Sequence, residues 1–468
     1  MKRTLRLLAA ALMLTAALSV GAAAADFEPV AQELSTIGMF RGTGSGFELD
    51  RAPTRAEAAI MLVRLYGAED SAAADYAAGA ISHPFTDVPA YAAPHVAWLY
   101  TEGLTKGVSA DRFGSAELCT AQSYATFLLR ALGYADGVDF AYADALVFAE
   151  QKGFYAPTMF PGDFLRDDLA ALTYQALAAD TSKGDTYLLK TLVDSGAVDK
   201  NAAQPMMEKM ELYREISVLE QPVDDEAAEL SMVMEIAEAF TADGTGITIE
   251  SYGSTMGSLK TIVHGDSAEA SYLMSSYVDD PYAGESNMDM AIWMKDGWVY
   301  QYASDGAESQ AVKYPVENEE TVLEELALPT IDSMNVTGLA LVKSITREKD
   351  GSDTIYTVTI GENLGGLVGN AGQLMPPVPE GDGMASFSSN IAESTLVYMT
   401  DRRGELKGMG IFLSPSTTME IHGAKSTRYY HISLSIVVEA TGKDVKIEYP
   451  DFSYFVEVDP ALLEIPTE

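Results

Sequence analysis

The chain has 468 residues and carries 69 Asp and Glu against 30 Lys and Arg, so its formal net charge is −39 at pH 7. A chain this acidic repels nucleic acid and anionic membrane surfaces, and we therefore expect it to bind neither. Its one cysteine, Cys119, excludes an internal disulfide.

The first 25 residues have the features of a secretory signal peptide. Lys2 and Arg3 give a basic start, residues 7–20 are apolar, and the alanines at residues 22–25 offer a small-residue cleavage site. The apolar stretch is shorter than the roughly 20 residues that a bilayer-spanning helix needs, and no later stretch reaches that length. The sequence therefore predicts a secreted protein without a membrane span.

A glycine-flanked turn followed by a capped helix then occurs twice with the same layout. In the first copy, the turn at residues 38–42 precedes a Thr-Arg-Ala-Glu motif at residues 54–57, which opens an amphipathic helix. In the second copy, the turn at residues 103–107 precedes Phe113 and a helix over residues 120–132. Repetition of this kind indicates modules that bury their apolar faces by stacking on one another.

A third, degraded copy is expected because such modules need neighbours on both sides. Residues 138–180 supply it, with an amphipathic helix, a Lys-Gly-Phe turn at residues 152–154, and a last helix that opens at Arg166. We therefore assign three copies to residues 27–69, 85–134 and 138–180.

The second copy also contains Phe-Thr-Asp-Val at residues 85–88 and Trp98 in the helix before its turn. The three-copy set resembles the S-layer homology (SLH) domain family, whose repeats open with Phe-x-Asp-Val, run through a Trp-bearing helix, turn through Gly-x-x-x-Gly and close with Thr-Arg-Ala-Glu. The resemblance covers residues 26–180. It implies all-α repeats that form a three-fold pseudo-trimer and bind an acidic, peptidoglycan-linked secondary cell-wall polysaccharide in the grooves between repeats.

The Thr-Arg-Ala-Glu motif also has a physical interpretation of its own. Thr54 and Glu57 have the spacing of a helix capping box. Arg55 lies where free backbone N–H groups and the helix dipole favour an anion. By resemblance, Arg55 and residues near the glycine turns contact the polymer, and the polysaccharide-binding residues that we predict are Thr54, Arg55, Glu57, Arg41, Trp98, Lys106 and Arg166.

The copies depart from the family pattern at these positions. In the second copy Ala121 replaces the arginine and Ser123 the glutamate, so we expect one groove to have lost its anion ligand. The third copy keeps Arg166 and Asp168 but lacks the threonine, and the first lacks the Phe-x-Asp-Val opening.

After residue 180 the repeats end and the sequence pattern changes. A helical linker is predicted over residues 181–212, and a helical pattern, broken by Gln221 and Pro222, extends over residues 206–240. From Thr245 the apolar period is two, which indicates antiparallel hairpins. The expected strands cover residues 246–252, 258–264, 268–278, 288–294, 298–302, 339–347, 354–360, 394–400, 406–413, 428–440 and 447–449.

These elements predict an α+β domain over residues 213–460, with a curved antiparallel sheet covered by helices, one of them at residues 318–328, and a tail at 461–468. Residues 361–383, rich in Gly and Pro, are predicted to form a loop. The layout resembles the LolA and LppX type of half-barrel in bacterial surface lipoproteins, which implies a cavity for an apolar ligand. The residues that fit either this cavity or a plain core are Trp293, Trp298, Tyr300, Tyr302, Met288 and Met290.

The sequence contains no catalytic, cofactor-binding or metal-binding motif that we recognise, and its five histidines are scattered. We therefore predict a non-enzymatic protein of the bacterial cell wall or cell surface, anchored by its repeats and presenting a C-terminal domain to an apolar ligand or protein partner. Two alternatives remain: a wall-anchored hydrolase with an unrecognised carboxylate site, and a structural component of a surface layer.

Overall fold

The computed structural model describes residues 27–42, 44–160, 162–219, 228–242, 248–263, 270–280, 284–315, 338–361, 385–391, 394–421, 424–441 and 444–459. The described chain forms two compact units. Residues 27–215 and 338–342 make a helical unit, and the rest make a sheet unit. The predicted signal peptide, the helix expected at residues 318–328, nearly all of the predicted loop and the tail lie outside the described residues.

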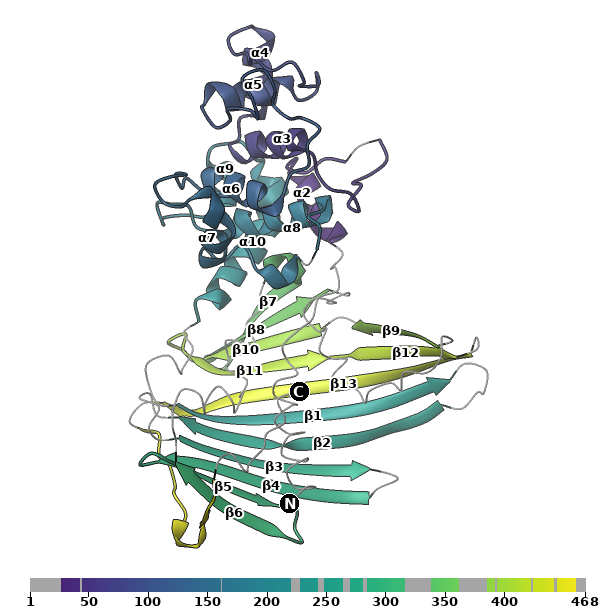
Figure 1. The fold of residues 1–468 in the computed structure, drawn as a ribbon, viewed down its shortest axis with the longest axis vertical. Helices are drawn as coiled ribbons and strands as arrows, with labels where there is room; N and C mark the ends of the chain where they lie inside the picture. The colour runs from purple at the N-terminus through teal and green to yellow at the C-terminus, as the bar shows by residue number, and fades with distance from the viewer. Residues whose placement is uncertain are drawn as a thin grey trace. The chain divides into compact units, whose positions relative to one another are not determined.

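The helical unit is built from short helices joined by turns (Figure 1). Its α-helices are α2 (Glu28–Thr36), α3 (Arg55–Leu65), α4 (Glu69–Ala77), α5 (Ala93–Thr101), α6 (Ala121–Ala131), α7 (Ala145–Gln151), α8 (Arg166–Ala178), α9 (Leu188–Asp194) and α10 (Lys200–Ser217). Short 3-10 helices are η1 (Tyr142–Asp144), η2 (Pro157–Met159) and η4 (Leu339–Leu341). Helices α9 and α10, in the stretch expected as a linker, belong to this unit.

Helix packing follows the repeats. The closing helices of the three copies are α3, α6 and α8, and α6 contacts both of the others. The opening helix of each copy packs on the closing helix of another copy: α5 on α3, α7 on α6, and α2 on α8. The core between them includes the fully buried side chains of Leu62, Tyr124, Leu128 and Tyr174. Because a copy's two helices meet through its neighbours, no copy buries its apolar face alone.

One hydrogen bond recurs in all three copies, nine residues after the first residue of each closing helix. Arg64 donates to the carbonyl of Met39 over 3.1 Å, and Arg130 donates to that of Leu104 over the same distance. In the third copy Gln175 takes the arginine's place. Each acceptor directly follows the first glycine of its copy's turn, so this bond fixes the turn against the end of the closing helix.

The sheet unit contains one large sheet, which curves across the unit (Figure 1). Its strands are β1 (Ala228–Ala242), β2 (Thr248–Val263), β3 (Ala270–Asp280), β4 (Gly284–Lys295), β5 (Trp298–Ser304), β6 (Ser309–Pro315), β7 (Val342–Asp350), β8 (Asp353–Ile360), β9 (Ala385–Ile391), β10 (Ser394–Thr400), β11 (Leu406–Leu413), β12 (Pro415–Ile421), β13 (Ala424–Thr441) and β14 (Val456–Glu457). The order is β14-β6-β5-β4-β3-β2-β1-β13-β11-β10-β8-β7, with β12 between β13 and β9. The strand pairs of known register are antiparallel, except for the parallel pair β14 and β6.

Two predictions are wrong near the start of this sheet, one of a helix and one of a pair of strands. The helical pattern extended to residue 240, but α10 ends at Ser217 and β1 is a strand. Its apolar residues fit a helical period, yet β1 hydrogen-bonds to β2 on one edge and to β13 on the other, and this tertiary pairing overrides the local pattern. The strands predicted at residues 246–252 and 258–264 were separated by a predicted break, but both belong to the single strand β2. Gly257 is an extra, unpaired residue in that strand, a β-bulge that shifts the register without ending the strand.

The hairpin predicted at residues 295–297 is confirmed, with Asp296 and Gly297 both at positive φ between β4 and β5. Its register places all four predicted aromatic residues on one face and Met288 and Met290 on the other. On the aromatic face, Trp293 and Tyr300 pack against Phe452 and Phe455. These aromatic side chains therefore form a packed cluster, closed by the segment around η6 (Phe452–Tyr454).

Candidate functional site

The start of α3 has the predicted capping box. Thr54 Oγ1 accepts a hydrogen bond from the backbone N–H of Glu57 over 3.3 Å, and Glu57 Oε2 accepts one from the Thr54 N–H over 2.8 Å. The box satisfies two N–H groups that a helix start leaves without partners. It also fixes the Glu57 carboxylate beside the first turn of the helix.

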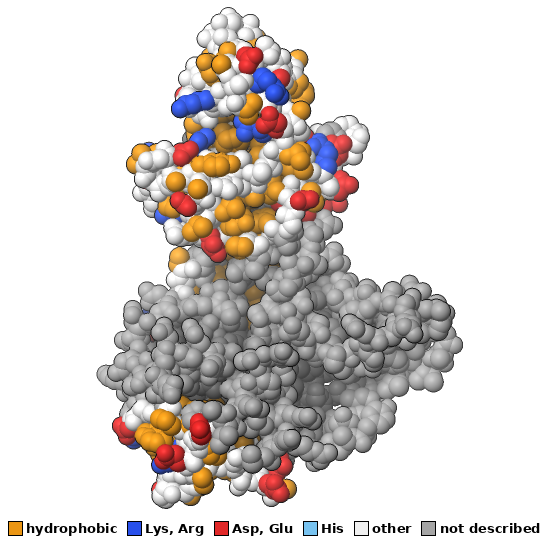
Figure 2. Space-filling model, viewed as in Figure 1, with side chains coloured by type: hydrophobic (Ala, Val, Ile, Leu, Met, Phe, Trp, Pro, Cys, Tyr) orange, Lys and Arg blue, Asp and Glu red, His pale blue; other side chains and the backbone are white. Residues whose placement is uncertain are grey.

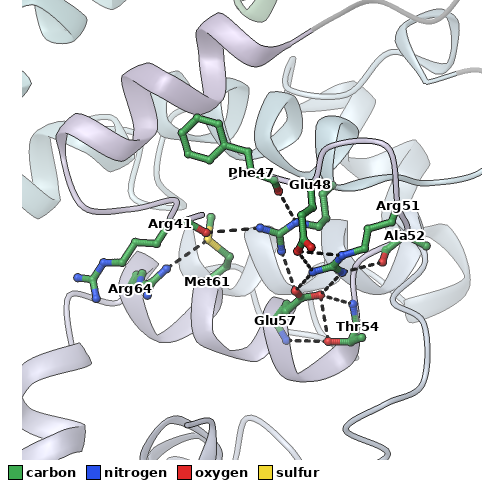
Figure 3. Close-up of polar contacts among 10 residues, drawn as sticks. Arg41, Phe47, Glu48, Arg51, Ala52, Thr54, Glu57, Met61 and Arg64 are labelled. Atoms are coloured by element: carbon green, nitrogen blue, oxygen red, sulfur yellow. Dashed lines mark hydrogen bonds and ion pairs between the residues drawn. The ribbon is translucent and has the colours of Figure 1, made fainter. Parts of the chain in front are cut away.

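Glu57 is the centre of an ion-pair network (Figure 3). Arg51 binds it with two N–H groups, at 2.6 Å to Oε1 and 3.0 Å to Oε2, and Arg166 Nη1 lies 2.9 Å from Oε1. Burial raises the pKa of Glu57, but the hydrogen bonds from Arg51 and Thr54 and the nearby charges outweigh it, so this pKa is below its ordinary value. The carboxylate is therefore ionised and shared between two arginines.

Arg166 is an interior residue with 4% of its surface exposed. Besides Glu57, it donates to the carbonyl of Phe47 over 2.9 Å and to that of Arg41 over 3.4 Å, and its guanidinium lies 4.9 Å from the centre of the Phe40 ring. Each of its three nitrogen atoms has a partner. The structure thus brings the predicted residues Thr54, Glu57 and Arg166 together, in a packed network that joins the third copy to the first.

Arg55 has different surroundings. Its Nε donates to the carbonyl of Phe113 over 3.3 Å, and its guanidinium lies 5.2 Å from the centre of the Phe113 ring. Within the described part of the chain, no carboxylate forms an ion pair with Arg55. The guanidinium is half-buried, held over an aromatic ring, and keeps its charge uncompensated at contact distance.

The backbone at this helix start differs from the prediction. We expected free N–H groups beside Arg55, but the Arg55 N–H donates to Glu117 and the Ala56 N–H donates to Ser115, while that of Glu57 is capped by Thr54. This expectation is wrong because the strand-like segment before α6 lies against the start of α3. Any anion bound here would depend on the guanidinium, not on the helix N-terminus.

Asp87 of the Phe-x-Asp-Val motif positions the ring beneath Arg55. Its carboxylate accepts hydrogen bonds from the backbone N–H groups of Phe113 at 2.7 Å, Gly114 at 2.8 Å and Ser115 at 3.3 Å. Burial raises the pKa of Asp87, but these hydrogen bonds outweigh it and the pKa lies below its ordinary value. The motif therefore acts as a loop clamp, a role that sequence reasoning did not assign.

Arg55 and Arg166 make equivalent contacts with the following copy. The Nε of each donates to a phenylalanine carbonyl seven residues before that copy's capping position, Phe113 before Thr120 and Phe47 before Thr54. Their backbone N–H groups also donate to equivalent carbonyls, at 2.8 Å and 2.9 Å. The two arginines therefore occupy the same kind of position at two successive contacts between copies, where the SLH resemblance predicts grooves; the first of these is the Arg55 groove.

Their difference is the residue at the glutamate position of the following copy. For Arg166 that residue is Glu57, and the pair forms; for Arg55 it is Ser123, which has no charge. The remaining groove has the opposite mismatch, because Ala121 supplies no cation to Asp168, whose pKa is raised by burial. The substitution at residue 123, visible in the sequence, thus removes the carboxylate that would pair with Arg55, and no other described residue supplies one.

The other predicted residues lie elsewhere in the unit. Arg41 is 57% exposed and pairs with Glu69 over 2.8 Å. Trp98 packs its ring on Tyr66, with 5.4 Å between the ring centres. Lys106 is exposed on its turn. The seven predicted residues therefore do not converge on one surface, and Phe113 and Asp87 belong to the Arg55 groove instead.

Among the described residues, no group of three or more His, Cys, Asp and Glu side chains is arranged so that it could hold a metal ion. Cys119 is buried, and burial raises the pKa of its thiol to about 12, so the reactive thiolate is scarce at neutral pH. Among the helices that the structure describes, none is long and apolar enough to cross a membrane.

Taken together, the fold is that of a protein with a helical repeat unit and a separate antiparallel sheet unit. Residues 84–120 match the S-layer homology domain, and they include the Asp87 clamp, α5 and the turn at residues 103–107. This confirms the SLH resemblance for the second copy. SLH domains bind secondary cell-wall polysaccharide and are a mark of bacterial cell-surface or cell-wall proteins. A comparison with curated proteins gives no match for this chain.

Proposed function

We propose that this chain is a non-catalytic cell-surface protein whose helical unit anchors it to secondary cell-wall polysaccharide through the Arg55 groove. The observation that carries the proposal is the uncompensated guanidinium of Arg55, held over Phe113 in the copy that matches the SLH domain. An acidic group on the polymer would take the place that Glu57 occupies beside Arg166. Charge-assisted hydrogen bonds of this kind contribute roughly 1.5–3 kcal/mol.

The three copies would form a pseudo-trimer, in which each arginine lies against the following copy. Two observations support this arrangement: the cyclic packing of opening on closing helices, and the equivalent backbone bonds made by Arg55 and Arg166. In such a ring the first and second copies would form the groove that binds an anion. The groove with Arg166 would be closed by its own ion pair.

The anion contact would be local. On the face shown in Figure 2, basic and acidic side chains are interspersed over the helical unit and leave no continuous basic surface. The overall charge of −39 opposes a polyanion, so attraction would depend on a single fixed guanidinium at short range.

The sheet unit would present a ligand or partner surface, as in the half-barrel domains that its layout resembles. Its registers place five exposed apolar side chains on one face of the sheet: Val233, Leu273, Phe412, Tyr429 and Val437. Exposed apolar side chains that share a face favour contact with an apolar ligand or with another protein.

The anchoring proposal is tested by sedimenting the protein with purified bacterial sacculi. The wild type should sediment, whereas Arg55→Ala should weaken binding by about 10- to 150-fold, the loss expected for one charged hydrogen-bonding group. Sacculi stripped of their secondary polymer should not retain the wild type. The control is Arg403→Ala, which removes an exposed, ion-paired arginine of the sheet unit and should bind like the wild type.

Sedimentation of Arg55→Ala at the wild-type level would refute the role of this groove. Failure of the wild type to sediment would refute anchoring altogether. The variant Ser123→Glu offers an independent test, since it keeps Arg55 but places a carboxylate at the position equivalent to Glu57.

A further inference from the structure

A pocket of about 370 Å³ opens at the C-terminal end of α3. It lies between the turn at residues 38–42, the first turn of α4 and the turn between α9 and α10, and it is lined by Arg41, Arg64, Tyr66 and Glu69 among others. Because α3 spans 11 residues, the pocket is about 15 Å from Arg55 along the helix. The α9–α10 turn lies beyond the three repeats, so the pocket combines a repeat with a later element.

Two close contacts fix the walls of the pocket. Gly67 has a φ of +67°, and a side-chain carbon there would overlap the Cβ of Ala197 in the α9–α10 turn. On the other wall, Arg64 Nη1 holds the carbonyl of Met39 at 3.1 Å. Both walls are therefore tied to the end of α3, and the pocket is preformed, as ligand pockets of this size usually are.

Both arginines of the pocket are already paired with Glu69. Glu69 lies 2.8 Å from Arg41 and 3.0 Å from Arg64, and His95 Nε2 approaches it at 3.4 Å. Burial raises the pKa of Glu69, but the bond from Arg64 and the nearby charges outweigh it, so this pKa lies below its ordinary value. Asp70 lies exposed at the rim, so the lining contains two arginines and two carboxylates.

The equal numbers of arginines and carboxylates in the lining decide which class of ligand fits the pocket. An anionic ligand would have to compete with Glu69 for the arginines, and a cationic ligand would have to compete with the arginines for Glu69. An uncharged polyhydroxyl ligand meets neither obstacle, because hydroxyl groups both donate and accept. The pocket offers them the remaining N–H groups of Arg41 and the carboxylate oxygens of Glu69 and Asp70, while the Tyr66 ring supplies an apolar wall.

We infer that this pocket is a subsite for an uncharged sugar residue, separate from the Arg55 groove. The inference rests on the proposed function, since it makes the pocket a second contact with the same class of polymer. The groove would recognise the acidic substituent, and the pocket a neutral ring of the chain. A polymer spanning both would gain affinity from two linked contacts.

The test is saturation-transfer NMR on the full chain with three probes: methyl N-acetyl-β-glucosaminide, methyl α-mannoside and methyl β-glucuronide. We expect transfer to at least one of the uncharged glycosides. Arg41→Ala removes the exposed donor of the pocket and should weaken that binding about tenfold. Asp70→Trp, at the exposed rim, should block the pocket while leaving Arg41 and Glu69 in place.

Controls separate this inference from the anchoring proposal. Arg55→Ala and Arg403→Ala should bind the uncharged glycoside like the wild type, even where Arg55→Ala no longer sediments with sacculi. The inference is overturned if neither uncharged glycoside shows transfer, if the glucuronide alone does, or if both pocket variants bind like the wild type. None of these outcomes would change the result of the sedimentation test.

Discussion

Replacing Arg166 with methionine tests whether the Glu57 network holds the helical unit together. The methionine keeps most of the side chain's volume but removes the ion pair to Glu57 and the bonds to two carbonyls, of Phe47 and Arg41. Removing one partner of a buried pair costs about 3–5 kcal/mol. Because Arg51 still neutralises Glu57, we expect the lower end of that range, about 3 kcal/mol.

Calorimetry of the full chain measures this loss. For a unit of this size, about 1 kcal/mol lowers Tm by roughly 2–4 °C, so Arg166→Met should lower the helical unit's transition by about 6–12 °C. The sheet unit's transition serves as an internal reference. Arg41→Met is the matched control, because it breaks an exposed ion pair that contributes at most about 1 kcal/mol.

A double-mutant cycle with Glu57→Gln then isolates the interaction energy between Arg166 and Glu57. The cycle subtracts the stability changes of the two single variants from that of the double variant. A Tm shift of Arg166→Met no larger than that of Arg41→Met would refute the argument. It would mean that the buried contacts of Arg166 add no more to the free energy of unfolding than an exposed ion pair does. The ion pair with Glu57 would then not be strong enough to keep an anion away from Arg166.

Three further predictions follow from single positions. Ser123→Glu should raise the Tm of the helical unit by about 1–3 °C through a new pair with Arg55 and should abolish sedimentation with sacculi. Because its folded pKa is depressed, Glu57 adds stability above its unfolded pKa and loses it as pH falls, so a pH series of Tm between about 5 and 3 should be steeper for wild type than for Glu57→Gln. Gly67→Ala should cost roughly 2 kcal/mol more than Gly79→Ala in denaturant unfolding, because both have positive φ but residue 79 faces open space.

Local features of the helical unit could be predicted from the sequence. Thr54 and Glu57 at capping-box spacing gave the helix start correctly, and the second copy's motifs lie within the matched residues. The loss of charge at residues 121 and 123 was also visible. Such features depend on residues only a few positions apart in the sequence, so sequence patterns are enough to predict them.

Features set by distant parts of the chain were missed. Arg166 and Glu57 are 109 residues apart, and nothing local shows that one neutralises the other. The residues of β1 have a helical apolar period, but pairing with β2 and β13 decides their conformation. Because β13 lies far along the chain, the local pattern could not show this pairing. The pocket near Arg41 needs a turn beyond the repeats, whose position follows only from the close approach of Gly67 and Ala197.

The degeneracy of the repeats and the candidate site have the same cause. If every copy kept both the arginine and the glutamate, each groove would contain a neutral pair like Arg166 with Glu57, and an acidic polymer would have to displace a carboxylate to bind. The serine at residue 123 removes that competitor from one groove, and among the described residues no carboxylate pairs with Arg55, which lies over Phe113. The serine at residue 123 departs from the family pattern, and the same departure leaves the Arg55 guanidinium available to an anion. The second copy therefore contributes to the candidate site by lacking the glutamate.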